Sequence, residues 1–474
     1  MTRVSPLLLT ILFTTISCDL LDLVGGGIFN GDNPPQIQFG AEANPTGNPI
    51  GGGEGYSEIF TNGDYVVHDA GELLLAFAVA QPGEVIYVAP DSEINMNGND
   101  QLFIPEGVTL AGNRGQNGSP GPLLYMTYVN TGDILFRPET GTRITGLRIK
   151  GPEADLPDID YDVNPATKSR GFRIHGATQV EIDNCEISNW QRAGIEVEIN
   201  ASDVYIHHNH LHDVHSYPVS VLSYSTPPVL IEANRIDWIW HATAGAGDPG
   251  SGYEARYNII TRKAVPDSWQ PYDGSHAIDM HADDEIEASR DQLVGADVIR
   301  ISYNTFIEEA EGDPSVALHR DAYIRGVPRI IAEFHHNCFL NTDPAQAVVH
   351  MGGNVWVHHN LYGPDSTLVV IADETTPQIL FHNPPPPAEE VPIMTGDFLE
   401  VDVEVNVLDQ LELSIVRIEL NGEEIYAGTG APAPGELMID LTELDPAMPY
   451  HELLVKAVDN RGVIGQHMTV FRVE

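Results

Sequence analysis

Apolar-x-apolar pairs recur at regular intervals through the middle of the chain. Seven segments begin with such a pair, continue with two mostly polar residues and usually end in Asn: VEIDNC, VYIHHN, VLIEAN, YEARYN, IRISYN, AEFHHN and VWVHHN. From Val180 to Val355, the pairs begin 24, 25, 24, 46, 33 and 23 residues apart. The alternation predicts short strands, and the period predicts a solenoid with one coil per step. The two long steps indicate coils with inserted loops, because loops tolerate extra length at little entropic cost.

The Asn that closes these segments is predicted to be structural. It recurs at Asn209, Asn234, Asn258, Asn304, Asn337 and Asn360, and Cys185 takes the same place in the first coil. An inward Asn at a coil bend can bond backbone groups of the neighbouring bends, which would otherwise be buried unpaired. The same geometry places Cys185 and Cys338 five coils apart, about 24 Å at the usual strand spacing. That separation excludes a disulfide between them.

The first residues predict export. Arg3 precedes an apolar run from Leu7 to Ile16, which is typical of a signal peptide (1–17) and too short to span a membrane. The segment TISC, ending at Cys18, resembles a bacterial lipobox. The resemblance implies cleavage before Cys18 and attachment of lipid to its thiol; an ordinary signal peptide with an incidental cysteine is the alternative. Residues 18–60, rich in Gly, Asn and Pro, are expected to form the anchor and a flexible tether.

The segment VVHDAGELLLAFAVAQPGEVIYVAP begins the folded part. It predicts a short helix from Leu73 to Val79, a stop at Pro82-Gly83 and a strand from Val85 to Val88. This order, followed by GVTLAG, resembles the start of pectate-lyase-like right-handed parallel β-helices. The resemblance covers about residues 65 to 380 and implies an all-β solenoid whose helix caps the open end. We assign residues 61–383 to it.

A second unit follows the proline run from Pro384 to Pro387. Residues 384–390 are expected to be a linker, and residues 391–474 alternate as strands do, with a hairpin-like Asn421-Gly422. Near the end, LLVKAVDNRGVIGQ resembles the last strands of bacterial immunoglobulin-like domains. The resemblance implies a small immunoglobulin-like β-sandwich that serves for spacing or attachment.

Candidate chemistry lies on the strand that follows each bend. The segments AGIEVEI, YPVSVLS, HAIDMHA, SVALHRD and AQAVVHM align with their apolar pairs inward, Ile278 and Met280 among them. Alternation then turns the following residues outward. His281, His319 and His350 are predicted to form a column on three coils, about 4.8 Å apart. Asp279 shares the outward face with His281, and Arg320 follows His319.

Imidazole acts as an acid or base near neutral pH and binds metals, and a nearby carboxylate can fix its tautomer or join the metal site. The candidate catalytic residues are therefore His281, His319, Asp279 and Arg320. The candidate ligands for a divalent cation, Ca²⁺ or Zn²⁺, are Asp279, His281, His319 and His350. Simple packing of like residues on adjacent coils is the alternative. A second run, HHNHLHDVH from His207 to His215, is metal-like by composition alone.

The segment IRGVPRIIAEFHHN is similar to the Arg-Pro-Arg region of one pectate-lyase family, but Ile331 stands where its final Arg would be. In that family's wider fold class, Arg or Lys acts as base while calcium held by acids neutralises the substrate carboxylate. Candidate groups for binding such a carboxylate are Arg325, His350, Arg262 and Lys263.

The net charge of the chain limits the kinds of molecule that it is expected to bind. The chain carries 23 Lys and Arg against 69 Asp and Glu, for a formal charge of -46. This balance excludes nucleic acid, which needs clustered cations. The leading hypothesis is an exported, membrane-anchored lipoprotein, in the periplasm or on the cell surface, that acts on an acidic polysaccharide by lyase or hydrolase chemistry. The alternative is a non-catalytic β-helix that binds glycan or another surface, as an adhesin or a structural lipoprotein.

Overall fold

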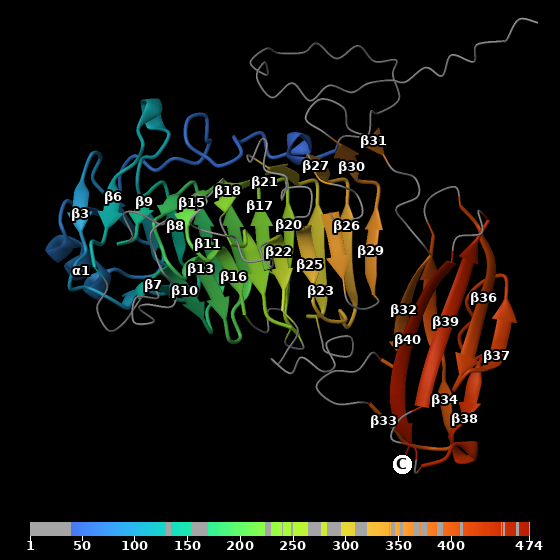
Figure 1. The fold of residues 1–474 in the computed structure, drawn as a ribbon. Coiled ribbons are helices and arrows are strands. Elements are labelled where there is room, and N and C mark those ends of the chain that lie inside the picture. Colours follow the sequence, from blue (N-terminus) through green and yellow to red (C-terminus); the bar gives the residue numbers. More distant parts are fainter. Residues whose placement is uncertain are drawn as a thin grey trace, which may run out of the picture.

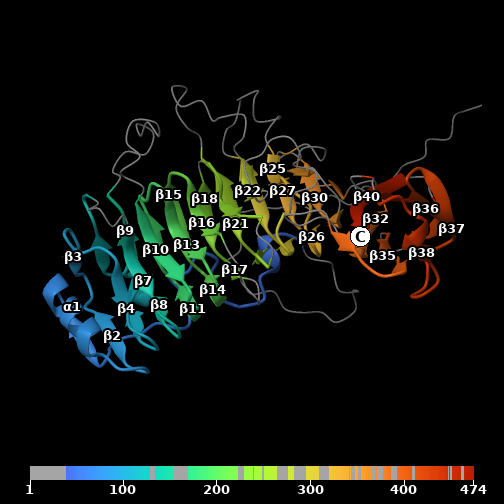
Figure 2. The same ribbon diagram turned by 90° about the horizontal axis from the view of Figure 1, so that it is seen from below.

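Most of the chain winds into a parallel β-helix, seen from the side in Figure 1 and from below in Figure 2. Each coil of this computed structural model passes through three sheets in turn, as β10, β11 and β12 do before β13 returns to the first sheet. The residues that the structure describes are 39–128, 134–152, 169–222, 229–238, 240–247, 250–263, 276–281, 295–308, 320–340, 342, 347–350, 354–363, 369–370, 377–385, 392–407, 411–446, 448, 451–460 and 464–473.

The strands of each sheet are parallel, except that β31 runs antiparallel to β30. The first sheet holds β4 (Leu102–Ile104), β7 (Ile134–Pro138), β10 (Arg170–His175), β13 (Ala193–Glu198), β16 (Tyr217–Val221), β19 (Thr243–Gly245), β22 (His276–Met280), β25 (Arg320–Ile324) and β28 (Val348–His350). The second sheet holds β1 (Tyr65–Val67), β2 (Val85–Val88), β5 (Thr109–Ala111), β8 (Arg143–Thr145), β11 (Thr178–Asp183), β14 (Ser202–His207), β17 (Val229–Glu232), β20 (Gly252–Arg256), β23 (Val298–Ser302), β26 (Ile331–His335) and β29 (Val355–His358). The third sheet holds β3 (Glu93–Asn95), β6 (Leu123–Tyr125), β9 (Arg148–Lys150), β12 (Glu186–Ser188), β15 (His210–Val214), β18 (Arg235–Trp238), β21 (Ile259–Arg262), β24 (Thr305–Glu308), β27 (Cys338–Leu340), β30 (Leu361–Gly363) and β31 (Val369–Val370).

The predicted Asn ladder is confirmed between the second and third sheets. The Asn234 side-chain oxygen accepts a hydrogen bond from the Asn209 backbone N–H at 2.9 Å, and the Asn258 side chain does the same for Asn234 at 2.8 Å. Each side-chain amide also donates to a backbone carbonyl of the preceding coil, as Asn258 does to Ile231 at 2.9 Å. Cys185 occupies the first place of the ladder and donates its N–H to Asn209. Cys185 and Cys338 are buried and form no disulfide.

The predicted cap helix is also confirmed. Helix α1 (Ala70–Val79) starts three residues earlier than expected, because the Asp69 side chain caps it by accepting the Glu72 N–H. Leu73 and Ala76 are the buried residues of α1, and both belong to the apolar core of the β-helix. The helix therefore covers apolar side chains that would otherwise lie open at the first coil.

Residues 39–64 do not form the flexible tether that was expected to reach residue 60. They lie along the β-helix, beginning with the 3₁₀ turn η1 (Ala41–Ala43), as the blue segment in Figure 1 shows. The Gly40 N–H donates to the His336 carbonyl at 2.8 Å, and the Gly51 N–H donates to the Ala233 carbonyl at 2.9 Å. The flexibility expected from the composition is wrong for this segment, because its glycines pack closely against the backbone of the β-helix. We call residues 39–64 the strap.

The C-terminal unit has its own apolar core and largely antiparallel sheets. Its strands are β32 (Gln378–Asn383), β33 (Ile393–Met394), β34 (Phe398–Glu400), β35 (Asp402–Asn406), β36 (Leu413–Leu420), β37 (Glu423–Gly428), β38 (Met438–Asp440), β39 (His451–Asp459) and β40 (Ile464–Val473). This unit also contains the 3₁₀ turn η7 (Leu441–Glu443), whereas the 3₁₀ turn η2 (Gln116–Gly118) belongs to the β-helix. Asn421 and Gly422 form the predicted turn of the β36–β37 hairpin, both at positive φ. The expected boundary after residue 383 is wrong. Strand β32 pairs with β35, and Ile379 and Phe381 belong to the second core, so this unit begins before the proline run.

Candidate active site on the first sheet

The outer face of the first sheet carries a row of mostly polar side chains, one from each coil between β10 and β25. Ile278 and Met280 are buried in the core, as predicted, and Asp279 lies between them on the opposite face of β22. The register continues this outward row through Arg173, Glu196, Ser220, Ala244, Asp279 and Tyr323. Asp279 is nevertheless fully buried, with 0% of its surface exposed, because neighbouring side chains cover it.

The Asp279 carboxylate is surrounded by nitrogen donors. Arg325 binds it through two contacts, Nε to Oδ1 at 3.0 Å and Nη2 to Oδ2 at 2.5 Å. His276 Nε2 lies 2.6 Å from Oδ1, and His281 Nε2 lies 2.6 Å from Oδ2. Burial alone would raise the pKa of Asp279, but the charge of His276 and the hydrogen bonds from His276 and His281 hold it well below its usual value. The carboxylate is therefore ionised.

His281 is the most exposed group of this cluster, with 46% of its side chain exposed against 19% for Arg325. Its Nε2 lies between the Asp279 carboxylate and Arg325 Nη2, which is 2.8 Å away. These two contacts require opposite states of Nε2. The carboxylate needs a proton on Nε2 to accept, whereas the guanidinium can only donate and needs a lone pair there. We assign the proton to Nε2, because the contact with Asp279 is shorter and charge-assisted. His281 Nδ1 then carries a lone pair, and it has no hydrogen-bond partner among the described residues.

His241, one coil earlier, is held as a neutral imidazole. Burial, helped by the charge of His276, lowers the pKa of His241 to about 3 despite the opposing attraction of Asp279. Its Nδ1 lies 2.8 Å from the His276 carbonyl, which can only accept, so Nδ1 carries the proton. The bare Nε2 faces Asp279 Oδ2 at 3.7 Å. His241 also stacks on Tyr217, which fixes its ring.

Tyr323 places an aromatic ring beside the cluster. It follows Asp279 in the outward row, on β25. The Arg320 guanidinium lies 4.5 Å from the centre of this ring and that of Arg325 lies 5.8 Å from it, both within the range of cation–π attraction. His276 meets the same ring edge-on at 5.4 Å. No carboxylate pairs with Arg320 in the described part of the chain, so its charge is available at this face.

The predicted column of His281, His319 and His350 is not formed. Ala322 pairs with Ile278 and Ile324 with Met280, so these two residues take the inward places expected for Val316 and Leu318. Arg325 consequently stands beside His281 where His319 was expected, and His319 lies outside the described residues.

His350 is also one position out of the expected register. Val348 lies opposite Ala322 and His350 lies opposite Ile324, in the two places where Ala347 and Val349 were expected. A slip of one residue moves every side chain of a strand to the other face. Both SVALHRD and RDAYI offer an apolar-x-apolar pair, so the sequence did not distinguish the two registers.

Arg262 and Lys263 lie elsewhere. Arg262 ends β21 on the third sheet and is buried, and Lys263 Nζ lies 3.5 Å from Asp237 Oδ2, also on the third sheet. The structure therefore joins Asp279, His281, Arg320 and Arg325 around Tyr323, and it separates Arg262 and Lys263 from them. Sequence reasoning missed His241, His276 and Tyr323. The repeated dipeptide His-Ala at residues 241 and 276, one coil apart, is a signal that could have found the two histidines.

A divalent cation does not fit well at Asp279. Donor atoms of His241, His276 and Asp279 lie within 4.8 Å of one another. However, both carboxylate oxygens already accept hydrogen bonds, and the guanidinium of Arg325 lies 2.5 Å from one of them. A metal ion would have to displace these donors and lie close to a positive charge. The arrangement instead suits acid–base chemistry at His281.

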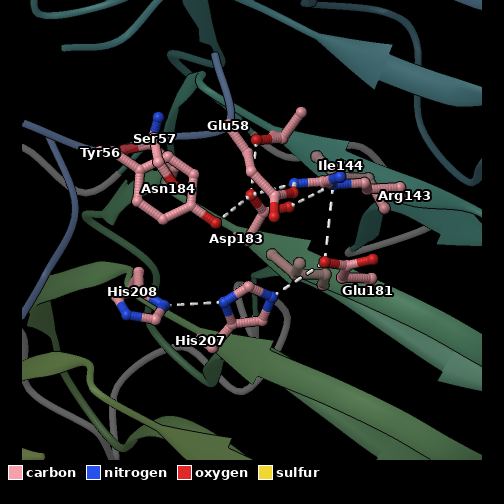
Figure 3. A network of polar contacts seen from close by, with 12 residues as sticks. Tyr56, Ser57, Glu58, Arg143, Ile144, Glu181, Asp183, Asn184, His207 and His208 are labelled. Carbon is pink, nitrogen blue, oxygen red and sulfur yellow. Dashed lines mark hydrogen bonds and ion pairs between the residues drawn. The ribbon is translucent and has the colours of Figure 1, made fainter. Parts of the chain in front are cut away.

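A separate polar network joins the strap to the second sheet (Figure 3). Arg143 binds Asp183 through Nε to Oδ1 and Nη2 to Oδ2, both at 2.9 Å, and the Tyr56 hydroxyl donates to Asp183 Oδ2 at 2.9 Å. Glu181 binds His207 at 3.0 Å, and His207 contacts His208 at 2.8 Å. These side chains satisfy one another and are largely buried, so we interpret the network as structural.

An open cavity of about 450 Å³ lies at another part of the first sheet, lined by Phe103, Arg137, Arg173 and His175 among others. It is not at Asp279: Arg173 is four places from Asp279 in the outward row, about 19 Å at the usual strand spacing. Within the part of the chain that the structure describes, no helix is long and apolar enough to cross a membrane. Cys18 and the predicted signal peptide lie outside the described residues.

Comparison with known proteins supports the fold. Residues 134–268 match the family described as the right-handed β-helix region. No curated protein sequence matches the chain. Among solved structures, an alginate lyase from Paenibacillus sp. str. FPU-7 is similar at 14% sequence identity and a TM-score of 0.32, over 62% of this chain and 98% of that one. This resemblance is too distant for the enzyme's reaction to be transferred.

Proposed function

We propose that the protein acts on an acidic polysaccharide at the outer face of β22 and β25, as a lyase. The observation that carries the proposal is the buried Asp279 carboxylate, which holds a half-exposed imidazole and a guanidinium at one point of this face. A carboxylate that orients an imidazole raises its strength as a base and fixes the nitrogen that acts. Perturbed titratable groups of this kind concentrate at functional sites.

Each group has a role in the proposed elimination. Arg320, whose charge no described acid neutralises, binds the carboxylate of a uronic acid residue and makes the adjacent C–H more acidic. His281 Nδ1 removes that proton. The C–O bond to the leaving sugar breaks as the C=C bond forms, and the leaving oxygen takes a proton from water. Asp279 and Arg325 position His281 and do not touch the substrate.

The sequence features at both ends fit a protein that works outside the cytoplasm. In this proposal the chain is exported, anchored through lipid on Cys18, and carries an immunoglobulin-like C-terminal unit as a spacer. The high negative charge keeps such a domain soluble. An acidic polysaccharide is repelled by the overall negative charge of the protein. Its binding in this proposal therefore depends on local cations such as Arg320.

The test is a panel of uronic acid polymers, assayed with the full chain for absorbance from new double bonds and for new reducing ends. We expect activity on at least one polymer, and a loss of about 10²–10⁴-fold in rate for His281→Ala, the usual contribution of a general base. His175→Ala is the matched control, because His175 is 43% exposed and also bound to a carboxylate, Glu198 at 2.9 Å. Equal loss in both variants, or silence across the panel, would overturn the lyase proposal. Polymer binding without turnover would identify the non-catalytic module instead.

A further inference from the structure

Glu186, His210 and His212 bring three metal-binding side chains together on the third sheet. His210 and His212 are two residues apart on β15, so they share one face of the strand. Glu186 on β12 lies directly opposite His210 in the register. One donor atom from each residue lies within 4.8 Å of the other two.

The His212 ring is already oriented for a ligand. Its Nδ1 lies 2.7 Å from Asp213 Oδ2, and a carboxylate can only accept, so Nδ1 carries the proton. The other nitrogen, Nε2, faces Glu186 Oε1 at 3.6 Å. Histidines that bind metals commonly donate their second N–H to a carboxylate in this way, which fixes the tautomer and strengthens the ligand.

His210 is held in a similar manner. Its Nε2 lies 3.4 Å from Asp237 Oδ2 on the neighbouring strand β18, and its ring centre lies 4.4 Å from that of His212. Lys263 and Arg235 pair with Asp237 rather than with Glu186. Among the described residues no lysine or arginine forms an ion pair with Glu186, so a cation could share its carboxylate with His212.

The cluster differs from the two other groups of potential metal ligands among the described residues, one at Asp279 and one at Asp183. At Asp279 the carboxylate is already paired with the guanidinium of Arg325, and at Asp183 it is paired with that of Arg143. The side chains of Glu186, His210 and His212 are partly exposed, at 31%, 27% and 22%, so ions in solution can reach them. The net charge of -46 further raises the concentration of cations near the surface.

We propose that Glu186, His210 and His212 bind a divalent transition-metal ion of the zinc type. Two imidazoles and one carboxylate are a common zinc ligand set, and a solvent molecule would complete a tetrahedral site. Donors around such an ion lie about 3.3 Å apart, given metal–ligand bonds of about 2.0–2.2 Å. The separation of 3.6 Å between His212 Nε2 and Glu186 Oε1 needs little adjustment to reach this. Calcium is disfavoured, because it prefers oxygen ligands throughout.

The experiment is calorimetric titration of Zn²⁺ into the purified full chain after removal of metal with a chelator. We expect one site, weakened more than about 100-fold by His212→Ala or His210→Ala, and about 10–100-fold by Asp213→Asn, which acts only through His212. Asn tolerates the left-handed backbone of Asp213, at φ 50°, so this variant should fold. His175→Ala removes a histidine from another face and should leave the affinity unchanged.

Two outcomes would overturn the proposal. One is the absence of Zn²⁺ binding to the full chain in the titration. The other is binding that His212→Ala and Asp213→Asn leave intact, since the ion would then lie elsewhere. Neither outcome depends on polysaccharide activity, because the titration contains no substrate.

Discussion

Arg325 holds Asp279 in a two-point ion pair, although the two residues lie 46 positions apart in the chain. The pair joins consecutive coils of the first sheet and fixes the position of His281 between its charges. It therefore connects the stability of the β-helix at this coil to the geometry of the proposed base.

Asp279→Asn should destabilise the β-helix strongly. The substitution leaves the Arg325 guanidinium and the His276 and His281 N–H groups without the carboxylate that binds them, and breaking a buried pair in this way costs about 3–5 kcal/mol. Chemical denaturation followed by circular dichroism measures the loss. Glu58→Gln is the control: Glu58 also binds an arginine, at 2.9 Å, but it is 61% exposed, so its loss should cost at most about 1 kcal/mol. Equal effects would show that burial does not decide the contribution of the pair.

Acid should destabilise the β-helix before its carboxylates are protonated. Buried His241 and His215 and half-buried His335 have pKa values lowered to about 3, 4 and 4, chiefly by desolvation. Between these values and about 6.5, the ordinary pKa of histidine, the unfolded chain binds more protons than the folded one, so stability falls as the pH falls. Thermal melting from pH 7 to pH 4.5 measures this slope. His241→Asn, whose side-chain N–H can still donate to His276, should make the slope shallower by about one proton. An unchanged slope would contradict the assignment to His241.

The Asn ladder predicts two opposite effects. Asn258→Ala leaves the Asn234 N–H and the Ile231 carbonyl without partners, at a cost of about 1–3 kcal/mol each. Cys185→Asn should instead preserve or raise stability by about 1 kcal/mol, because an amide there can donate to the Ile144 carbonyl, now 3.8 Å from the thiol. Chemical denaturation of both variants measures these changes in stability. A Cys185→Asn protein as unstable as Asn258→Ala would show that the first place of the ladder has no room for an Asn side chain.

Two glycines of the strap offer a matched comparison. Gly52 and Gly55 both have positive φ, at 69° and 90°. A Cβ on Gly52 would lie 2.4 Å from the His208 carbonyl oxygen, whereas a Cβ on Gly55 would meet nothing within 4 Å. Gly52→Ala should therefore release the strap and increase its cleavage by a nonspecific protease, and Gly55→Ala should change cleavage little. Equal protection in both variants would show that the close contact is not what holds the strap.

Lipidation is testable in the cell. Cys18→Ser should move the protein from the membrane fraction to the soluble fraction and abolish labelling by a fatty acid, because the proposed anchor is the thiol of Cys18. The Cys185→Asn protein retains Cys18 and should remain with the membrane. A Cys18→Ser protein that stays there would favour the ordinary signal peptide.

The sequence by itself determined the coil, its bends and the inward residues of β22. A repeat near 24 residues, closed by Asn, leaves few alternatives to a parallel solenoid, and alternation around Ile278 and Met280 put Asp279 and His281 on the outer face. These features are local or periodic, so they can be read without knowing which coils carry insertions.

Only the tertiary structure decided what stands beside Asp279. Two apolar pairs compete for one place in the first sheet, and pairing with β22 and β28 selects Ala322 and Ile324, which brings Arg325 rather than His319 to His281. The strap and β32 depend likewise on partners far away in the chain. Such choices rest on the packing of neighbouring coils, which a period of two along one strand does not encode.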